Sequence, residues 1–401
     1  PFLMQLKAVF TDKYMLLLLG YFLLYTLTSQ LKNVALPYYC NYVLGTYSDG
    51  ITQTLVSVLG GIPMGIGIFA VWPLAKKFGK KNITVVGFIL YAFGSAVCWT
   101  APTNLYIVLV GQFIKNIGGL PCAYVFMALF SDALDNLEWK NGFRCDGTAM
   151  SVYSVIITAA AGLVTGIFNG GLSAAGYLAP ETVSVMPELT DAMQKIITNA
   201  DGTFAVIFNQ PDAVNTIFTF FFVGLEAIAG LVYAFMLIPV TVEKTVNKKL
   251  VIIRARQKAE CEARGEVWVE PEIRAAEEQK KMDAEAEEIY RKELKERCEK
   301  KGIDYDAALE KHIEAVRVKQ EKQTEKERLA KIKAEEKAKI SADKKAAKLA
   351  KMSPEQRAKY DARQEKKARR DEEKWQKERA EGEVCYEKMQ KTLANAEAKK
   401  N

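Results

Sequence analysis

Long apolar runs alternate with short polar connections over the first 240 residues of the chain. Six of these runs approach or exceed the roughly 20 residues that a helix needs to cross the hydrocarbon core of a bilayer. Lipid leaves unpaired backbone groups unsatisfied, so apolar runs of this length predict helices that cross a membrane. The first part of the chain is therefore expected to be an all-α membrane domain. Its spans are expected at Tyr14–Tyr39, Ile51–Ala75, Ile83–Thr100, Leu105–Phe130, Thr148–Leu172 and Ala213–Val240.

The connections between these spans alternate in charge. The second and third spans are joined by KKFGKK (76–81), and the fourth and fifth by SDALDNLEWKNGFRCDG (131–147). The alternate connections, residues 44–50 and 101–104, contain no Lys or Arg. Because Lys and Arg concentrate on the cytoplasmic side of membranes, the charged connections and both ends of the chain are predicted to be cytoplasmic. The long external connection, residues 173–212, carries an amphipathic stretch, VMPELTDAMQKIITNA, which predicts a short surface helix.

Beyond about residue 245 the chain becomes strongly charged. Residues 1–240 contain 11 Lys/Arg and 12 Asp/Glu, and the remainder contains 44 and 36, so the net charge of +7 arises in the second part. Acids and bases three or four residues apart there predict exposed helix. We therefore divide the chain into a six-span domain, residues 1–245, and a charged, Ala/Lys/Glu-rich helical extension, residues 246–401. Its apolar residues keep no heptad rhythm, which favours lone helices over a coiled coil.

Enzymatic and metal-binding chemistry find no support in the sequence. The seven Cys are isolated, no CxxC pair occurs, and the one His, His312, lies in the charged extension. Neither a phosphate-binding glycine motif nor a GxSxG nucleophile motif is present. We expect no enzyme activity, no metal site, no bound cofactor and no nucleic-acid partner.

Polar side chains at membrane depth are the candidates for function, because they are costly there and are retained for a reason. Glu226 is the single acid inside an expected span, and Lys32 is too deep in the first span for snorkelling to be assured. Each candidate has a structural alternative. Glu226 could be a protonated packing residue, Lys32 could snorkel or pair with another helix, and the other polar residues could form ordinary interhelical hydrogen bonds. The substrate or cavity candidates are Lys32, Asn33, Asn116, Tyr124, Tyr153, Ser154, Thr158 and Glu226.

The connection at residues 131–147 carries a compact cluster of mixed charge. Asp132, Asp135 and Glu138 recur every three residues, which places their carboxylates along one face at a helix end. Arg144 or Lys140 is close enough in sequence to pair with them. We interpret the cluster as a cytoplasmic gate that holds one conformation of a transport cycle, and a solvated membrane anchor is the alternative.

The same connection resembles the loop between the tenth and eleventh helices of the glycoside–pentoside–hexuronide:cation symporters, of the form aDxxDyxExkxgxRxxg. Asn136 departs from it by replacing the usual aromatic residue. LPYYCNYVLG (36–45) is similar to the YYxxYvlG at the end of the seventh helix of that family, and KKFGKK to its eighth-to-ninth helix loop. Asn116-Ile117-Gly118 with Pro121 fits its tenth helix, and Gly176-Tyr177 fits the end of its eleventh.

This resemblance covers about residues 1–250 and implies the carboxyl-terminal half of a twelve-helix major facilitator fold. A sugar would bind between two six-helix halves that rock to alternate access. In that family the cation-binding acids belong chiefly to the amino-terminal half. Thr158 occupies the position at which the family commonly has a lysine, which leaves the coupling ion open. The chain opens with Pro1 rather than Met, so we expect a fragment whose beginning is missing.

The function expected from the sequence is secondary active transport of a sugar or glycoside across the cell membrane, coupled to Na⁺ or H⁺. Its expected partners are the lipid bilayer, the sugar and the missing amino-terminal half. One alternative is an uncoupled sugar facilitator, which Thr158 suggests. The other is a six-span membrane scaffold whose charged tail binds a cytoplasmic partner that the sequence does not identify.

Overall fold

The computed structural model describes residues 2–46, 50–302 and 304–398. Pro1 and part of the connection between the first two spans lie outside this range. Contacts divide the chain into two units: Pro1–Ala255 with Ala380–Asn401, called unit 1, and Arg256–Arg379, called unit 2. The domain boundary proposed at residue 245 remains a prediction. By its contacts, unit 1 continues to Ala255 and takes in the chain again from Ala380.

Six helices of the described chain are long and apolar enough to cross a membrane, as predicted from the hydrophobic pattern. They extend beyond the predicted runs, because each continues into polar residues at its ends. The spans are Lys13–Val43, Gly50–Phe78, Lys80–Thr100, Leu105–Asn141, Asp146–Ala175 and Asp212–Lys244.

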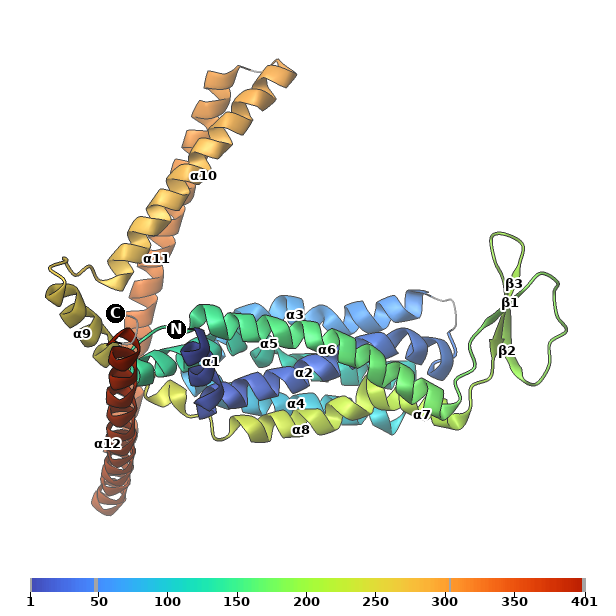
Figure 1. Cartoon of the computed structure of the whole chain (residues 1–401), viewed down its shortest axis with the longest axis horizontal. Helices are drawn as coiled ribbons and strands as arrows, with labels where there is room; N and C mark the ends of the chain where they lie inside the picture. Colours follow the sequence, from blue (N-terminus) through green and yellow to red (C-terminus); the bar gives the residue numbers. More distant parts are fainter. Residues whose placement is uncertain (1, 47–49, 303, 399–401) are drawn as a thin grey trace. The chain divides into compact units, whose positions relative to one another are not determined.

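The membrane-spanning helices of unit 1 run side by side, with a small sheet at one end of the bundle (Figure 1). Helix α5 packs on α3 and α4, and α8 packs on α4 and α2. The helical elements are α1 (Phe2–Thr11), α2 (Lys13–Tyr38), η1 (Tyr39–Val43), α3 (Gly50–Phe78), α4 (Lys80–Thr100), α5 (Leu105–Asn141), α6 (Asp146–Ala175), α7 (Asp212–Thr219), η2 (Phe220–Gly224), α8 (Leu225–Leu237), η3 (Val242–Lys244), α9 (Val246–Ala263) and the end of α12 (Pro354–Ala398).

The first and sixth spans each contain a turn of π-helix. In the first span η1 follows Pro37, and in the sixth span η2 joins α7 to α8 directly before Glu226. A π turn inserts an extra residue and re-aims the side chains that follow it, and such turns are frequent at functional sites. The ring of Tyr39 in η1 stacks on Phe222 in η2, with centroids 4.4 Å apart.

The long connection after α6 forms strands, so the surface helix predicted there is wrong. The strands β1 (Glu181–Val183), β2 (Met193–Thr198) and β3 (Phe204–Phe208) pair antiparallel in the order β1-β3-β2. The hairpin between β2 and β3 turns at Gly202, whose φ is +82°, a conformation that glycine adopts without strain. Ile196 and Ile197 are β-branched and favour this pairing, which the helical periodicity of the stretch concealed.

Glycines set the close approach between α4 and α5. A Cβ added at Gly94 would lie 2.4 Å from the backbone nitrogen of Lys115, and one added at Gly118 would lie 2.4 Å from that of Tyr91. Small residues let membrane helices approach closely enough for backbone packing, which takes the place of the hydrophobic effect inside lipid. The two helices therefore touch along their backbones, and polar side chains beside the contact are fixed in position.

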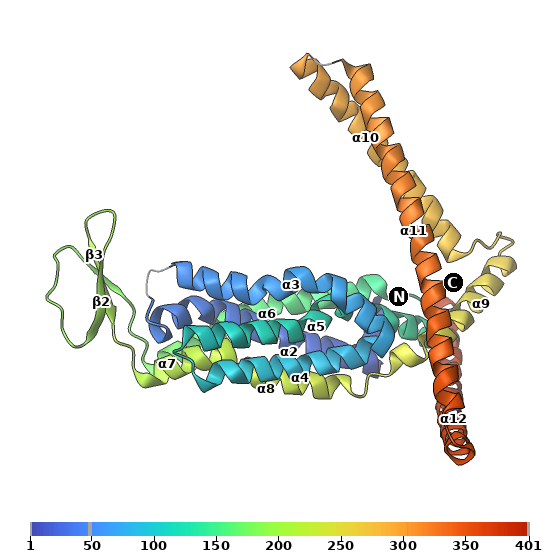
Figure 2. The same ribbon diagram turned by 180° about the vertical axis from the view of Figure 1, so that it is seen from behind.

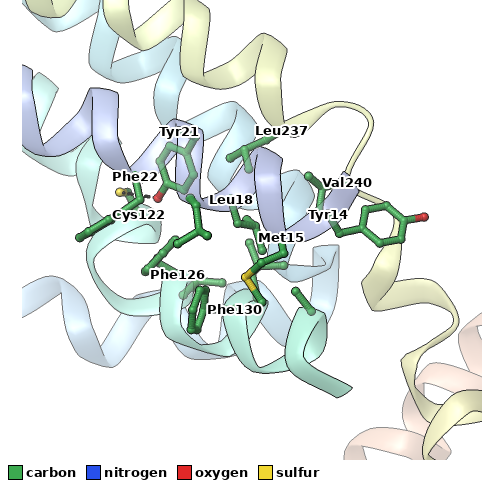
Figure 3. Close-up of a cluster of buried hydrophobic side chains, with 14 of the residues drawn as sticks. Tyr14, Met15, Leu18, Tyr21, Phe22, Cys122, Phe126, Phe130, Leu237 and Val240 are labelled. Carbon is green, nitrogen blue, oxygen red and sulfur yellow. Dashed lines mark hydrogen bonds between the residues drawn. The ribbon is translucent and has the colours of Figure 1, made fainter. Parts of the chain in front are cut away.

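Aromatic rings fill the core between α2, α5 and α8 (Figure 3). Tyr21 lies at its centre, with ring centroids 5.5 Å from Phe126 and 5.7 Å from Phe88, both edge-on. The Tyr21 hydroxyl and the Cys122 thiol are 3.0 Å apart, which satisfies the buried hydroxyl. This core holds the first, fourth and sixth spans together.

Unit 2 consists of charged helices: the end of α9, α10 (Pro271–Lys301), α11 (Tyr305–Ala350) and the first part of α12. Helices α10 and α11 lie against each other (Figure 2). Tyr290 stacks on His312 with centroids 4.1 Å apart, and His312 Nε2 is 3.0 Å from the Glu287 carboxylate. The expectation of lone helices is therefore wrong for this pair, which a ring stack and a side-chain hydrogen bond join without a heptad pattern.

Candidate functional site

A charged network lies inside the spans, where α2, α4, α5 and α8 converge. The Lys115 ammonium on α5 is 2.6 Å from the Glu226 carboxylate on α8, and both side chains are at most 2% exposed. The other carboxylate oxygen of Glu226 accepts a hydrogen bond from the Tyr91 hydroxyl on α4. Glu226 is therefore fully paired within the protein.

Close helix packing produces this pairing. Gly94 and Gly118 bring the backbone of α5 against α4, which places Lys115 beside Tyr91, with its ammonium 5.4 Å from the Tyr91 ring centroid. Gly230 brings α8 against α4, since a Cβ there would lie 3.0 Å from the Phe88 carbonyl oxygen. A paired charge is tolerated at this depth, whereas either partner alone would be an uncompensated charge in a medium of low dielectric constant.

Lys32 on α2 approaches the same network. Its ammonium is close enough to interact with Lys115 and with Glu226, and it lies 5.9 Å from the ring centroid of Phe222. Part of the Lys32 residue is exposed, but its amino group is buried, as are the side chains of Lys115 and Glu226. The structure thus brings together two residues proposed from the sequence, Lys32 and Glu226.

Lys115 and Tyr91 were missed by sequence reasoning. Lys115 is a charge within an apolar run, and the rule that selected Lys32 selects it equally. Tyr91 could be found only from the fold, because nothing in the sequence pairs the third span with Glu226.

The remaining cavity candidates do not join this network. Among them, Asn116 donates to the Gly60 carbonyl and Tyr124 to the Met64 carbonyl, 2.7 Å away, so both tie α5 to α3. Tyr153 stacks on Phe22 with centroids 4.2 Å apart. Ser154 and Thr158 are exposed on α6 and donate to carbonyls one turn earlier, and Asn33 is exposed on α2.

The gate candidates lie at the end of the bundle opposite the sheet, where Asp132 pairs with another helix. Asp132 accepts from Lys80 of the KKFGKK connection, with the closest atoms 2.7 Å apart. Glu138 is 3.6 Å from Arg144, which is 2.9 Å from Asp146. Asp135 is half-buried, and among the described residues it forms no ion pair closer than 4 Å, although its charge acts on Arg144.

The electrostatics around Arg144 favour its charged form. Burial disfavours the charge, but the hydrogen bond to Asp146 and the carboxylates of Glu138 and Asp135 outweigh it and hold the pKa of Arg144 above its ordinary value. Arg144 is therefore charged throughout the physiological pH range.

Asn136 and Asp12 extend the cluster to two further helices. Asp12 caps α2 by accepting from the backbone of Tyr14 and Met15. Its second oxygen accepts from Lys140 at 2.6 Å and from the Asn136 amide at 2.9 Å. Asn136 in turn accepts from the buried Lys249 at 2.6 Å. The residue that departs from the family loop thus bridges α2, α5 and α9, a function an aromatic ring could not perform.

The end of α12 packs on the same region of unit 1. A Cβ added at Gly382 would lie 2.0 Å from the ring of Trp139, which is itself fully buried. The Trp139 ring also lies 4.8 Å from the Lys249 ammonium. Residues from α1, α5 and α12 line an open pocket of about 370 Å³ here. The sequence placed no part of the extension against the bundle.

No cluster of potential metal ligands occurs among the residues that the structure describes. With the charged network and the six spans established, comparison with known proteins decides the family. The family model for MFS/sugar transport proteins matches residues 1–242. The chain belongs to this family. It is therefore a multi-pass membrane protein of a transporter family and not an enzyme.

Curated relatives from this family are symporters and sugar transporters. An uncharacterized symporter, YjmB, of Bacillus subtilis is 27% identical over 178 residues, which cover 43% of this chain and 37% of the relative. The isoprimeverose transporter of Lactiplantibacillus pentosus is 28% identical over 174 residues, covering 40% and 35%. A putative sulfoquinovose importer of Salmonella typhimurium is 31% identical over 147 residues, covering 35% and 29%. The chain thus spans about a third of the length of the curated relatives it matches.

Proposed function

We propose that this protein performs secondary active transport of a sugar or glycoside, with these six spans forming one of two halves that alternate access. The observation that carries the proposal is the Lys115–Glu226–Tyr91 network with Lys32 beside it, in a family of sugar transporters. Intramembrane charges of this kind mark substrate or ion pathways, because a purely structural helix contact is made at lower cost by apolar residues.

The proposed mechanism follows from the position of these helices. The π turn η2 and the glycine contacts fix Glu226 and Lys115, so this part of the half moves as one body. Rocking of such a body against the other half would expose Lys32 and its neighbours to each side in turn. The charge cluster opposite the sheet would lie in the cytoplasm with the charged extension, because the bases concentrate there.

Uptake into proteoliposomes tests the function. The intact transporter should accumulate a labelled sugar from a panel that contains a pentoside, a galactoside and a hexuronide when a Na⁺ or H⁺ gradient is imposed. Equilibration without accumulation under either gradient would establish an uncoupled facilitator instead. Absence of uptake for every sugar, in protein that is folded and inserted, would reject transport and favour the membrane scaffold.

The gate hypothesis is tested by Asp132→Asn. This change removes the charge that pairs with Lys80 and leaves the fold of α5 intact, because the amide still accepts a hydrogen bond. We expect the transport rate to change by about three- to tenfold, since the partly buried ion pair then no longer favours one conformation. Glu188→Gln, which changes an exposed carboxylate outside the cluster, is the control. An unchanged rate in Asp132→Asn at equal expression would assign the cluster to anchoring.

A further inference from the structure

A basic pocket lies where α1, α5 and the end of α12 meet, at the end of the bundle opposite the sheet (Figure 1). It is the open pocket of about 370 Å³ described above, and all of its lining residues belong to unit 1. Most of its lining is apolar, with contributions from Leu137 and Met389. Its charged lining residues are Lys7, Asp12, Lys140 and Lys388.

Two of the three lysines carry a charge that the protein does not neutralise. Asp12, the single acid that lines the pocket, lies 2.6 Å from the Lys140 ammonium and compensates it. Lys7 and Lys388 are exposed, and among the described residues neither forms an ion pair within 4 Å. The pocket therefore favours an anion that reaches Lys7 on α1 and Lys388 on α12 together.

An exposed apolar face of α1 borders the pocket. Phe2, Leu3 and Phe10 are each at least 50% exposed. Residues three and four apart are neighbours on a helix surface, so Lys7 lies beside Leu3 and Phe10 on one side. By the same spacing Lys7 lies beside Thr11, which lines the pocket. Lys7 is therefore at the border between the apolar face and the pocket.

This apolar face lies at the height of the membrane surface. Helix α1 ends at Thr11, and the first span begins at Lys13. The Gln5 side chain accepts a hydrogen bond of 2.6 Å from the Thr148 hydroxyl, which holds α1 against the start of the fifth span. A helix in this position places its apolar side chains at the boundary between the headgroups and the acyl chains.

We propose that the pocket binds the headgroup of an anionic phospholipid, whose phosphate is bound by Lys7 and Lys388 and whose acyl chains lie along the apolar face of α1. Anionic lipids concentrate in the cytoplasmic leaflet, the side on which the bases of this chain predict the pocket to lie. A soluble phosphate compound would supply the charge but leave the apolar lining in contact with water. Since the two lysines belong to different helices, the lipid would also hold the end of α12 on unit 1.

Labelling of Cys385 tests whether the pocket is occupied, because this exposed thiol is part of its lining. The intact transporter, with Cys385 as its single cysteine, is placed in nanodiscs of phosphatidylcholine with or without phosphatidylglycerol as about a fifth of the lipid. N-ethylmaleimide should label Cys385 at least about fivefold more slowly where phosphatidylglycerol is present, because the bound lipid covers the thiol.

A second thiol on α12 is the control. Ala394→Cys, in a protein without Cys385, places a thiol at an exposed position that does not line the pocket, and its labelling should be alike in the two membranes. Equal rates for Cys385 in the two membranes would overturn the proposal and leave this face to the other half of the transporter. An equal slowing of both thiols would overturn it too, since the anionic surface would then act on labelling in general.

Lysine variants separate a defined site from general attraction to an anionic surface. Lys7→Gln with Lys388→Gln should abolish the slowing of Cys385 labelling, and Lys7→Arg with Lys388→Arg should retain it, because the charges remain. Lys13→Gln with Lys391→Gln removes two exposed charges that do not line the pocket and should also retain it. The same loss in both glutamine double variants would overturn the site.

Soluble phosphates distinguish a lipid from a free anion. In nanodiscs of phosphatidylcholine alone, millimolar inorganic phosphate or glycerol 3-phosphate should leave the labelling of Cys385 unchanged, because neither covers the apolar lining. Slowing by either compound to the extent seen with phosphatidylglycerol would overturn the lipid as the ligand and assign the pocket to a soluble phosphate compound.

Discussion

At the scale of single residues, the pairing of Lys115 with Glu226 dominates the interior of the membrane unit. Two charged side chains that are at most 2% exposed and 2.6 Å apart stabilise each other only as a pair. Removing one member leaves the other desolvated and unpaired, which costs more than the pair contributes when it is complete.

Glu226→Gln should therefore destabilise the protein strongly. We expect the free energy of unfolding to fall by about 3 kcal/mol, because Lys115 and Lys32 then lack any carboxylate. Thermal unfolding in detergent measures this loss. The double variant Glu226→Gln with Lys115→Met should recover most of the stability and no transport. Equal stability of the single and double variants would show that Lys115 is not held by Glu226.

Cysteine labelling tests the burial of the connection at residues 131–147. Burial raises the pKa of Cys145 to about 11, so its reactive thiolate is scarce at pH 8, and its side chain is almost inaccessible. Cys385 is exposed on α12. A maleimide should label Cys385 at least about tenfold faster than Cys145 at pH 8 in single-cysteine proteins. Comparable rates would mean that the connection opens readily.

The sequence identified part of the site at this scale. Lys32 and Glu226 stand out because charge inside an apolar run is rare and costly. That rule cannot say which charges meet, because partners come from different spans. Asn116 and Tyr124 looked like cavity residues, yet each bonds a backbone carbonyl of α3, and only the packed structure shows where a polar group finds its partner.

At the scale of elements, backbone contact between α4 and α5 positions the site. Gly87 and Gly94 are seven residues apart on α4, and Gly111 and Gly118 are seven apart on α5, so each pair lies on one helix face. Whether a glycine packs depends on what faces it. Gly162 on α6 has no atom within 4 Å of an added Cβ, although it is as conspicuous in the sequence as Gly94.

Gly94→Ala and Gly162→Ala should consequently act in opposite directions. Alanine favours a helix over glycine by about 1 kcal/mol, so Gly162→Ala should leave thermal stability unchanged or raised. At Gly94 the new methyl group would lie 2.4 Å from the Lys115 backbone, and the forced separation should cost about 1–3 kcal/mol and displace Lys115 from Glu226. Melting temperatures of the two variants decide this, and similar values would contradict the close contact.

Elements within the membrane followed from hydrophobicity, and those outside it did not. The six spans are long and apolar, so composition alone defines them. The connection after α6 contains no long apolar run. Its apolar residues are spaced as in a helix, but its β-branched residues favour strands, and these pair across a hairpin. The predicted spans were too short, because helices continue into polar residues wherever side chains cap or pair them. At the start of α4, for example, the Glu243 carboxylate accepts from the backbone N–H groups of Lys80 and Lys81.

At the scale of the molecule, the last part of α12 belongs to unit 1, the unit that contains the six spans. Gly382 packs on the Trp139 ring, and Tyr386 and Gln390 pack on Gly142 at the end of α5. Gly142 has a positive φ of 79°, which ends the helix and lets α12 approach.

Gly382→Leu should release this contact, because no space exists for a side chain over Trp139. We expect the end of α12 to become sensitive to protease and Trp139 fluorescence to shift towards that of an exposed indole. Ala380→Leu adds the same bulk at an exposed position two residues earlier and should do neither. Retained protection in Gly382→Leu would show that α12 does not need Trp139 for its position.

The return of the chain to unit 1 at Ala380 has a further consequence. The stretch from Arg256 to Arg379 leaves the membrane unit and re-enters it, so it is a closed loop of chain and not a free tail. A tail explores a volume set by its full length, whereas a loop that is held at both ends reaches outward by at most half of its contour. A partner captured by this loop would be kept near the membrane unit, at a local concentration that depends on the α12 contact with Trp139.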